Sequence, residues 1–260
     1  MLAQIRRRLL ALPLPFSRSI AALPLAASLH TQPTRSSAMT DASKTLDIQI
    51  VSDNICPFCY LGKKKVEAAV AQLPKDVKVH IEWRPFQLDP MLPAPGVNKL
   101  VRYATKFGGQ ERVNGMLENM KAHGAKWGIN FSFGGNIGNT VDSHRLVEFS
   151  KQPAQGGGAH TDALINALFK RYFEEEQDLS TPDVLVSAAR EAGLPASEEE
   201  LRTFLRSDQL RKEVLGDMAS AAEAGISGVP HFIVNGQYAI SGAQEPDTFL
   251  AVFKKAGVAV

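Results

Sequence analysis

The chain has 260 residues, of which 44% are hydrophobic and 22% are charged, and its formal net charge is +2 at pH 7. This apolar content is enough for a sizeable buried core and excludes a disordered chain, and the near-neutral charge excludes a general electrostatic attraction to nucleic acid. The charge is unevenly distributed, because the first forty residues contain five arginines and no lysine or acidic residue. They contribute +5, so the remaining chain carries −3 and is mildly acidic.

The first forty residues have the composition of a mitochondrial transit peptide, which carries arginine and serine and lacks acids, so residues 1–44 are interpreted as a leader. Pro13, Pro15 and Pro24 interrupt the single apolar run that a secretory signal would need, and the stretch is too short for a membrane span. We therefore expect a mitochondrial location. Two alternatives stay open, namely a disordered N-terminal tail and a cytoplasmic form that starts at Met39.

The segment after this leader predicts a strand, a helix and a second strand. Leu46–Val51 alternates between apolar and polar residues and then becomes continuously apolar, which is typical of a strand with a buried face. Apolar residues at helical spacing then predict a helix that ends near Leu73, and Val77–Trp83 alternates again. Strand, helix and strand in this order favour a parallel pair with a right-handed crossover.

Helical periods broken by glycine and proline follow over residues 97–224. The candidate helices are Lys99–Phe107, Glu111–Trp127, Val141–Lys151, Thr161–Glu175, Pro182–Ala192 and Glu198–Ala222, the last with a break near Ser207. We expect capping hydroxyls at the helix starts Thr181 and Ser197.

Strand character returns near the C-terminus. His231–Val234 and Gln237–Ser241 flank Asn235-Gly236, a hairpin signal because both central residues of a type I′ turn need positive φ. A last helix is predicted over Pro246–Lys255. Without the helical block, the order is that of a thioredoxin core, so the sequence predicts an α/β thioredoxin fold with a large all-helical insertion between the second and third core strands. The expected parts are the leader at 1–44, the first part of the core at 45–96, the insertion at 97–224 and the second part of the core at 225–260.

Cys56 and Cys59, the only cysteines, enclose Pro57 and Phe58 where the first predicted strand is followed by a helix. Backbone N–H groups at a helix N-terminus stabilise a thiolate, so we expect Cys56 to be the attacking thiol. Cys59 lies one helical turn further on the same face, where it can resolve a mixed disulfide.

Three other interpretations of the cysteine pair are weaker. A purely structural disulfide across four residues would contribute only about 2 kcal/mol, which a chain of this size does not need. Zinc needs four ligands, and no two histidines stand at ligand spacing, so we expect no metal site. Two unrelated core cysteines would leave their position between strand and helix unexplained.

Several stretches, met in order, resemble the FrnE-type branch of DsbA-like oxidoreductases. They are Ser52–Gly62 around the cysteines, Trp83–Leu88, Asn139–Leu146, and Gly225–Phe232 with Ser241–Gln244. The resemblance spans residues 47–253 and implies a thiol-disulfide oxidoreductase of thioredoxin fold. It also implies that Val229-Pro230 is a cis peptide packed against the cysteine pair, and that Val229, Pro230, Pro57 and Phe58 contact the bound partner.

The same resemblance places the stretch that holds His144 and Arg145 near the active face, so a catalytic role is one interpretation. The other is a helix start capped by Asn139 or Thr140, with His144 hydrogen-bonded locally. We expect the neighbouring lysines Lys63–Lys65 to lie on the solvated face of their helix.

The predicted function is disulfide exchange with thiol- or disulfide-bearing proteins or small thiols. No cofactor is required, and glutathione is a candidate redox partner. Related kappa-class glutathione transferases and 2-hydroxychromene-2-carboxylate isomerases have serine where this chain has Cys56, and they lack the resolving cysteine. A glutathione-dependent transferase or isomerase stays open as one alternative, and a non-catalytic polypeptide-binding protein as another. We expect no nucleic-acid partner and no membrane span, and the sequence leaves a homodimer and the direction of electron flow open.

Overall fold

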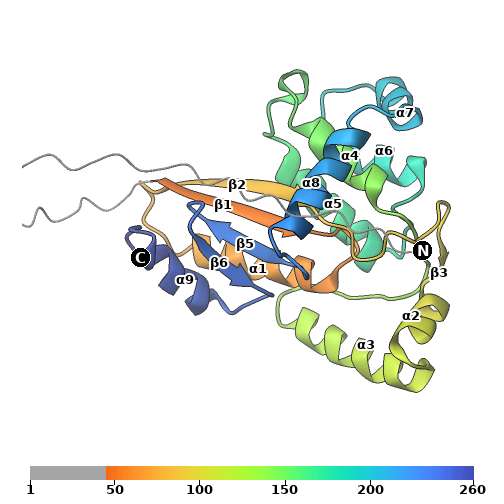
Figure 1. Cartoon of the computed structure of the whole chain (residues 1–260), viewed down its shortest axis with the longest axis horizontal. Helices are drawn as coiled ribbons and strands as arrows, with labels where there is room; N and C mark the ends of the chain where they lie inside the picture. The colour runs from red at the N-terminus through yellow and green to blue at the C-terminus, as the bar shows by residue number, and fades with distance from the viewer. Residues whose placement is uncertain (1–44) are drawn as a thin grey trace, which may run out of the picture. The chain divides into compact units, whose positions relative to one another are not determined.

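A four-stranded sheet forms the centre of the computed structural model, which describes residues 45–260; the leader and its targeting prediction lie outside them. β1 (Thr45–Ser52) pairs in parallel with β2 (Lys78–Pro85) after the crossover helix α1 (Pro57–Val70). β5 (His231–Val234) lies antiparallel to β1, and β6 (Tyr238–Ser241) lies antiparallel to β5. The strand order β2-β1-β5-β6 confirms the predicted thioredoxin core (Figure 1).

One face of this sheet is covered by α1 and by the C-terminal helix α9 (Pro246–Lys255), which pack against each other. Both reach the same side chain of β5, because Phe232 meets Phe249 edge to face at 4.8 Å between ring centres and also lies next to Gly62 of α1. The alternating pattern of β1 explains which of its side chains enter the core: those of Leu46, Ile48 and Ile50 are at most 1% exposed.

The predicted insertion between β2 and β5 is helical. Its elements are α2 (Lys99–Phe107), α3 (Gln110–Ala125), α4 (Val141–Ser150), the 3-10 turn η1 (Pro153–Gln155), α5 (Thr161–Phe173), α6 (Pro182–Glu191), α7 (Glu198–Arg206) and α8 (Arg211–Glu223). The predicted break near Ser207 is confirmed, because it separates α7 from α8. The sequence missed β3 (Val97–Asn98) and β4 (Asn136–Ile137), since two-residue strands show no periodicity.

The helices of the insertion form two groups. α2 and α3 pack against each other as a hairpin, whereas α4, α5, α6 and α7 are joined by contacts between neighbouring members, and α8 returns to β2 (Figure 1). Tyr60 of α1 stacks on Phe169 of α5 at 5.0 Å, so aromatic packing joins the insertion to the core. No helix among residues 45–260 is long and apolar enough to cross a membrane.

The prediction for the lysine run of α1 is wrong. Lys63 is 1% exposed and pairs with Glu67 and Asp162, and Lys65 is 8% exposed and pairs with Glu245 at 2.5 Å. The spacing within α1 could not show that α5 and the loop before α9 bring acidic side chains to this part of the helix.

The two predicted capping hydroxyls differ. Ser197 accepts a hydrogen bond from the backbone of Glu200, whose side chain accepts one from Ser197 in return, so the predicted cap is confirmed as a capping box. Thr181 is the N-cap of α6 but makes no side-chain capping bond. That part of the prediction is wrong.

Candidate active site

Cys56 occupies the N-cap of α1, directly before Pro57, whose ring suits the first helical position because the helix needs no N–H there. The first turn of α1 contains no acidic residue, so no negative charge opposes the positive end of the helix. The Cys56 thiol donates a hydrogen bond to the carbonyl oxygen of Val229, with 3.5 Å between Sγ and O. This thiol therefore lies between a helix N-terminus and the loop before β5.

Cys59 lies behind Cys56 on the inner side of α1. It is 1% exposed, and burial raises the pKa of its thiol well above the ordinary value, with the neighbouring Cys56 adding to the increase. Interactions with Ser52 and Asp53 lower this pKa and offset the increase only in part. Both cysteines are free thiols in this structure. Cys59 is thus a protonated, shielded thiol that must lose its proton before it can attack.

The predicted cis peptide bond at Val229-Pro230 is confirmed. Pro230 is buried against α1, where a Cβ atom added to Gly62 would lie 2.9 Å from Pro230 Cγ. Val229 is only partly buried, and its backbone borders the thiol of Cys56. The loop and the cysteine pair, which are far apart in the sequence, therefore form one site.

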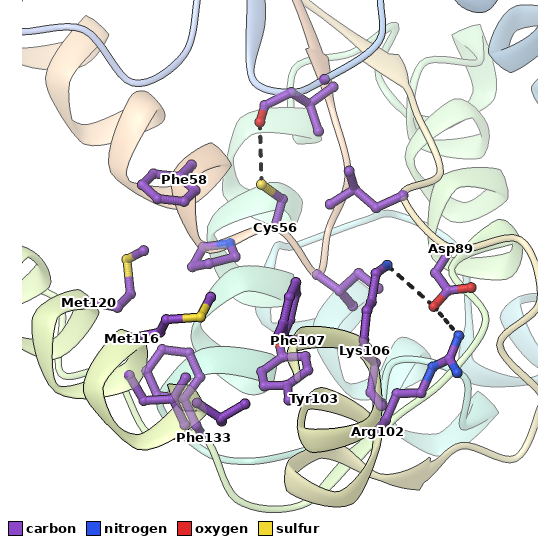
Figure 2. Close-up of a pocket in the computed structure, with 18 residues that line it drawn as sticks. Cys56, Phe58, Asp89, Arg102, Tyr103, Lys106, Phe107, Met116, Met120 and Phe133 are labelled. Atoms are coloured by element: carbon purple, nitrogen blue, oxygen red, sulfur yellow. Dashed lines mark hydrogen bonds and ion pairs between the residues drawn. The ribbon is translucent and has the colours of Figure 1, made fainter. Parts of the chain in front are cut away.

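A cavity of about 330 Å³ opens beside Cys56 (Figure 2). The α2–α3 hairpin supplies much of its wall, through Phe107 of α2 and Met116 and Met120 of α3, and Phe133 closes it from the segment after α3. Sequence analysis assigned none of these wall residues to the site. The signal was present in α3, where Val113, Leu117 and Met120 recur at helical spacing, but it did not show what the apolar face covers.

One end of the cavity is charged. Asp89 accepts a hydrogen bond from Arg102 Nη2 at 2.6 Å and one from Lys106 Nζ at 3.4 Å. Burial of Asp89 would raise the pKa of its carboxyl, but the bond from Arg102 and the charges of Lys106 and Arg102 outweigh it and lower that pKa. These are the charged side chains among the described residues that line the cavity, so its lining carries two cations and one carboxylate.

The sequence profile of the DSBA-like thioredoxin domain matches residues 47–254, which include most of β1, the other strands of the sheet and the whole insertion. The chain belongs to this DsbA-like family.

This DsbA-like chain is also similar to individual proteins and solved structures. An uncharacterised protein of Bacillus subtilis, YwbO, is 29% identical over 209 residues, which cover 79% of this chain and 94% of that protein. The crystal structure of a probable DsbA oxidoreductase from Streptomyces coelicolor is 31% identical with a TM-score of 0.73, covering 81% of this chain and 89% of that one. A 2-hydroxychromene-2-carboxylate isomerase structure covers 81% of this chain and 94% of its own at 14% identity and a TM-score of 0.54, a likeness of fold alone.

His144 of this DsbA-like protein lies behind the cysteine motif, and the expected local hydrogen bond of its side chain is not formed. Its Nε2 atom stands 3.6 Å from Oδ1 of Asp53, and both side chains are almost fully buried. Asp53 also accepts backbone hydrogen bonds from Leu88 at 2.8 Å and Ile55 at 3.3 Å. Of the two expected caps of α4, Thr140 is the N-cap but makes no side-chain capping bond, and the side chain of Asn139 accepts from the first backbone N–H of that helix. His144 does not line the cavity beside Cys56.

Arg145 faces away from the cysteines and holds the insertion together. Its guanidinium, 1% exposed, donates to the backbone carbonyls of Phe204 at 3.1 Å, Ser207 at 2.6 Å and Gln209 at 2.8 Å. These carbonyls belong to the end of α7 and the turn before α8, and that of Phe204 also accepts from the backbone N–H and the hydroxyl of Ser207. Arg145 thus fixes that turn, and its contacts are those of a structural residue.

Proposed function

We propose that this DsbA-like protein exchanges disulfides with its partners, with Cys56 as the nucleophile and Cys59 as the resolving thiol. The observation that carries the proposal is the asymmetry of the pair. Both thiols are buried, but Cys56 lines the cavity at a helix N-terminus beside Val229, whereas Cys59 does not line it and has a raised pKa. A partner can therefore reach the first sulfur and not the second.

The exchange runs in two steps. The Cys56 thiolate attacks one sulfur of a partner disulfide and forms a mixed disulfide, and the partner's other sulfur leaves as a thiolate that takes up a proton. Cys59 then gives up its proton and attacks Sγ of Cys56, which releases the first partner sulfur. The partner gains two electrons and the protein ends with a Cys56–Cys59 disulfide. The reverse sequence oxidises a partner dithiol.

The surroundings of Cys56 support a polypeptide or small thiol as partner. Phe58, beside the motif, is 51% exposed and offers an apolar contact next to the reacting sulfur. Val229 is partly exposed in the loop before β5, where its backbone can pair with an extended chain. We assign Pro57, Phe58, Val229 and Pro230 to partner binding. Glutathione is the proposed reductant that converts the Cys56–Cys59 disulfide back to the dithiol.

Two finer assignments rest on the sequence. The order of the motifs around Cys56, Trp83, Asn139 and Gly225 supports the proposal that the chain is of the FrnE-type branch. The arginine-containing leader supports the proposal of a mitochondrial location. A fusion of residues 1–44 to a fluorescent protein tests the second assignment, and a cytoplasmic signal would contradict it.

A redox titration tests the proposal directly. The purified protein is equilibrated with glutathione buffers of increasing oxidised fraction, and the free thiols are trapped and counted by mass. We expect a reversible two-electron couple at Cys56 and Cys59, whose potential reports the preferred direction. A pair that does not cycle contradicts the proposal. The rival activity, glutathione conjugation, is measured with a small electrophile, and conjugation retained by Cys56→Ser would favour a transferase.

A further inference from the structure

The cavity beside Cys56 combines apolar walls with a cationic end. We propose that it selects a small thiol or disulfide that carries an apolar body and a carboxylate, with the body against the α2–α3 hairpin and the carboxylate at Lys106. This assignment rests on the proposed function, because it names the substrate class of the same site.

The dimensions and walls of the cavity fit a small molecule. A volume of about 330 Å³ lies at the lower end of the range for small-molecule sites, which are mostly apolar with a few placed polar groups. Met116 is 43% exposed at the cavity, whereas Met120 and Phe133 are buried beneath it. Thioether side chains adapt to different apolar shapes, so the walls favour an aromatic or branched body without prescribing one.

The charges of the cavity fit an anion. Arg102 and Lys106 both face the single carboxylate of Asp89, so the lining carries one positive charge in excess. An uncharged apolar ligand would leave this excess charge unpaired. A ligand carboxylate neutralises it.

Lys106 is the cation with capacity to spare. Arg102 bonds Asp89 through Nη2 at 2.6 Å and its free Nε is buried, whereas the bond from Lys106 is longer, at 3.4 Å, and its more exposed ammonium group has three donors. The Lys106 side chain is 39% exposed and extends into the same cavity that Cys56 borders (Figure 2). A carboxylate can therefore bind Lys106 while Arg102 and Asp89 stay paired.

Reaction with such a disulfide follows the two steps of the proposed exchange. Cys56 forms a bond to one sulfur of the acidic disulfide, and the other half leaves as a thiolate. Cys59 then displaces the bound half, so that one disulfide becomes two thiols and the enzyme dithiol becomes a disulfide. Two molecules of another thiol, such as glutathione, return the enzyme to the dithiol form and leave as their own disulfide.

A pair of chromogenic probes tests the assignment. The reduced full-length protein is mixed with 5,5′-dithiobis(2-nitrobenzoic acid) or with its neutral dicarboxamide, and release of the arylthiolate is followed under single-turnover conditions. Each rate constant is divided by that of 2-mercaptoethanol with the same probe, which removes the intrinsic reactivity. We expect the acid-to-amide ratio to be about three to five, the range of a partly exposed ion pair, and to approach one in ~1 M salt.

Variants separate the two parts of the cavity. Lys106→Gln is expected to bring the ratio close to one, and Met116→Gln to lower both rate constants while keeping the ratio. Lys121→Gln is the matched control, because Lys121 is on α3, pairs with Glu118 and does not line the cavity; its ratio should stay as in the wild type.

The outcomes distinguish this assignment from the proposed function. If both probes react with the wild-type protein and their acid-to-amide ratio is one, the carboxylate site is excluded and disulfide exchange is still supported. A ratio that survives Lys106→Gln overturns the role of Lys106. If neither probe reacts at Cys56, the proposed function fails together with its substrate class.

Discussion

The Sγ atom of Cys56 lies 3.5 Å from the carbonyl oxygen of Val229, although 173 positions separate the two residues in the chain. Pairing of β1 with β5, in which Ile50 faces Phe232, brings the strand before Cys56 next to the strand after Val229. The redox centre is therefore shared by the two parts of the thioredoxin core, and a change in either part can alter it.

The two cysteines should respond differently to replacement. We expect Cys56→Ser to abolish disulfide exchange, because it removes the nucleophile at the cavity. Cys59→Ser should keep the first step and accumulate mixed disulfides, because the buried resolving thiol is lost. Mass spectrometry after incubation with a disulfide-bearing protein measures the adducts. Exchange that persists in Cys56→Ser would exclude the proposed mechanism.

Gly62 should be sensitive to the smallest enlargement. In Gly62→Ala the new methyl group would lie 2.9 Å from Pro230 Cγ and 3.1 Å from Phe232 Cζ, so the loop at Val229 or helix α1 must shift. We expect a loss of about 1–3 kcal/mol in the free energy of unfolding and slower exchange at Cys56. Denaturant unfolding and the single-turnover rate constant measure the two effects.

Gly115 provides the matched control for this experiment. It also lies within a helix, α3, but a Cβ atom added there would meet nothing within 4 Å. Gly115→Ala should stabilise the protein by up to about 1 kcal/mol, because alanine favours the helix. Equal effects of the two substitutions on unfolding would show that the close approach of Gly62 to Pro230 is unimportant.

His144 should behave as a structural residue. Its side chain is buried, faces Asp53 and does not line the cavity, so no contact with a partner is expected. We expect His144→Asn to reduce the free energy of unfolding by about 1–3 kcal/mol, because the smaller side chain loses packing contacts and no longer reaches the buried carboxylate of Asp53. The rate constant with the neutral aryl disulfide should change less than twofold. A tenfold slower reaction in a folded variant would instead give His144 a part in the chemistry.

Lys99 should make stability depend on pH in the alkaline range. It is fully buried, its ammonium lies 3.8 Å from the centre of the Tyr172 ring, and burial lowers its pKa from 10.5 to about 8 despite Glu176 and Asp178. Between these values the unfolded chain keeps a proton that the folded chain has lost. Unfolding then takes up a proton, and the free energy of unfolding rises with pH across this window.

Replacement of this lysine isolates the effect. Lys99→Met removes a buried charge that costs up to about 3 kcal/mol at neutral pH, so the variant should be more stable than the wild type at pH 7. The advantage should shrink steadily from about pH 8 to 10.5. Denaturant unfolding of both proteins at several pH values measures the difference, and an advantage that does not vary with pH would contradict the shifted pKa.

The thioredoxin core could be predicted because its signals are local. Local patterns predict three of its elements: the alternation in Leu46–Val51 predicts β1, the Asn235-Gly236 turn predicts the β5–β6 hairpin, and the proline at the start of α9 predicts that helix. The order of the elements then predicts the sheet. The helices Lys99–Phe107 and Pro246–Lys255 even have the predicted bounds. The position of the cysteine pair between strand and helix followed from the same local reasoning.

The walls of the cavity could not be predicted, because they depend on which surfaces meet. Met116 and Phe107 show that α2 and α3 have apolar residues, but only the packed hairpin shows that these lie beside Cys56. The ion pairs of Asp89 with Arg102 and Lys106 join the loop after β2 to α2, and the sequence of that loop has no periodicity that could predict them. Lys63 was misjudged for the same reason, since its acidic partner Asp162 comes from α5.

Pairing of Ile48 with Val234 also dictates an order of events during synthesis of the chain. The ribosome makes roughly 5–20 residues per second, so Cys56 emerges on the order of ten seconds or more before the loop that will adjoin it. Until then the edge of β1 that receives β5 has no partner strand, and loop closure over such a separation is slow. The reactive centre is thus completed only when the last strands arrive, and until then Cys56 lacks its contact with the carbonyl oxygen of Val229.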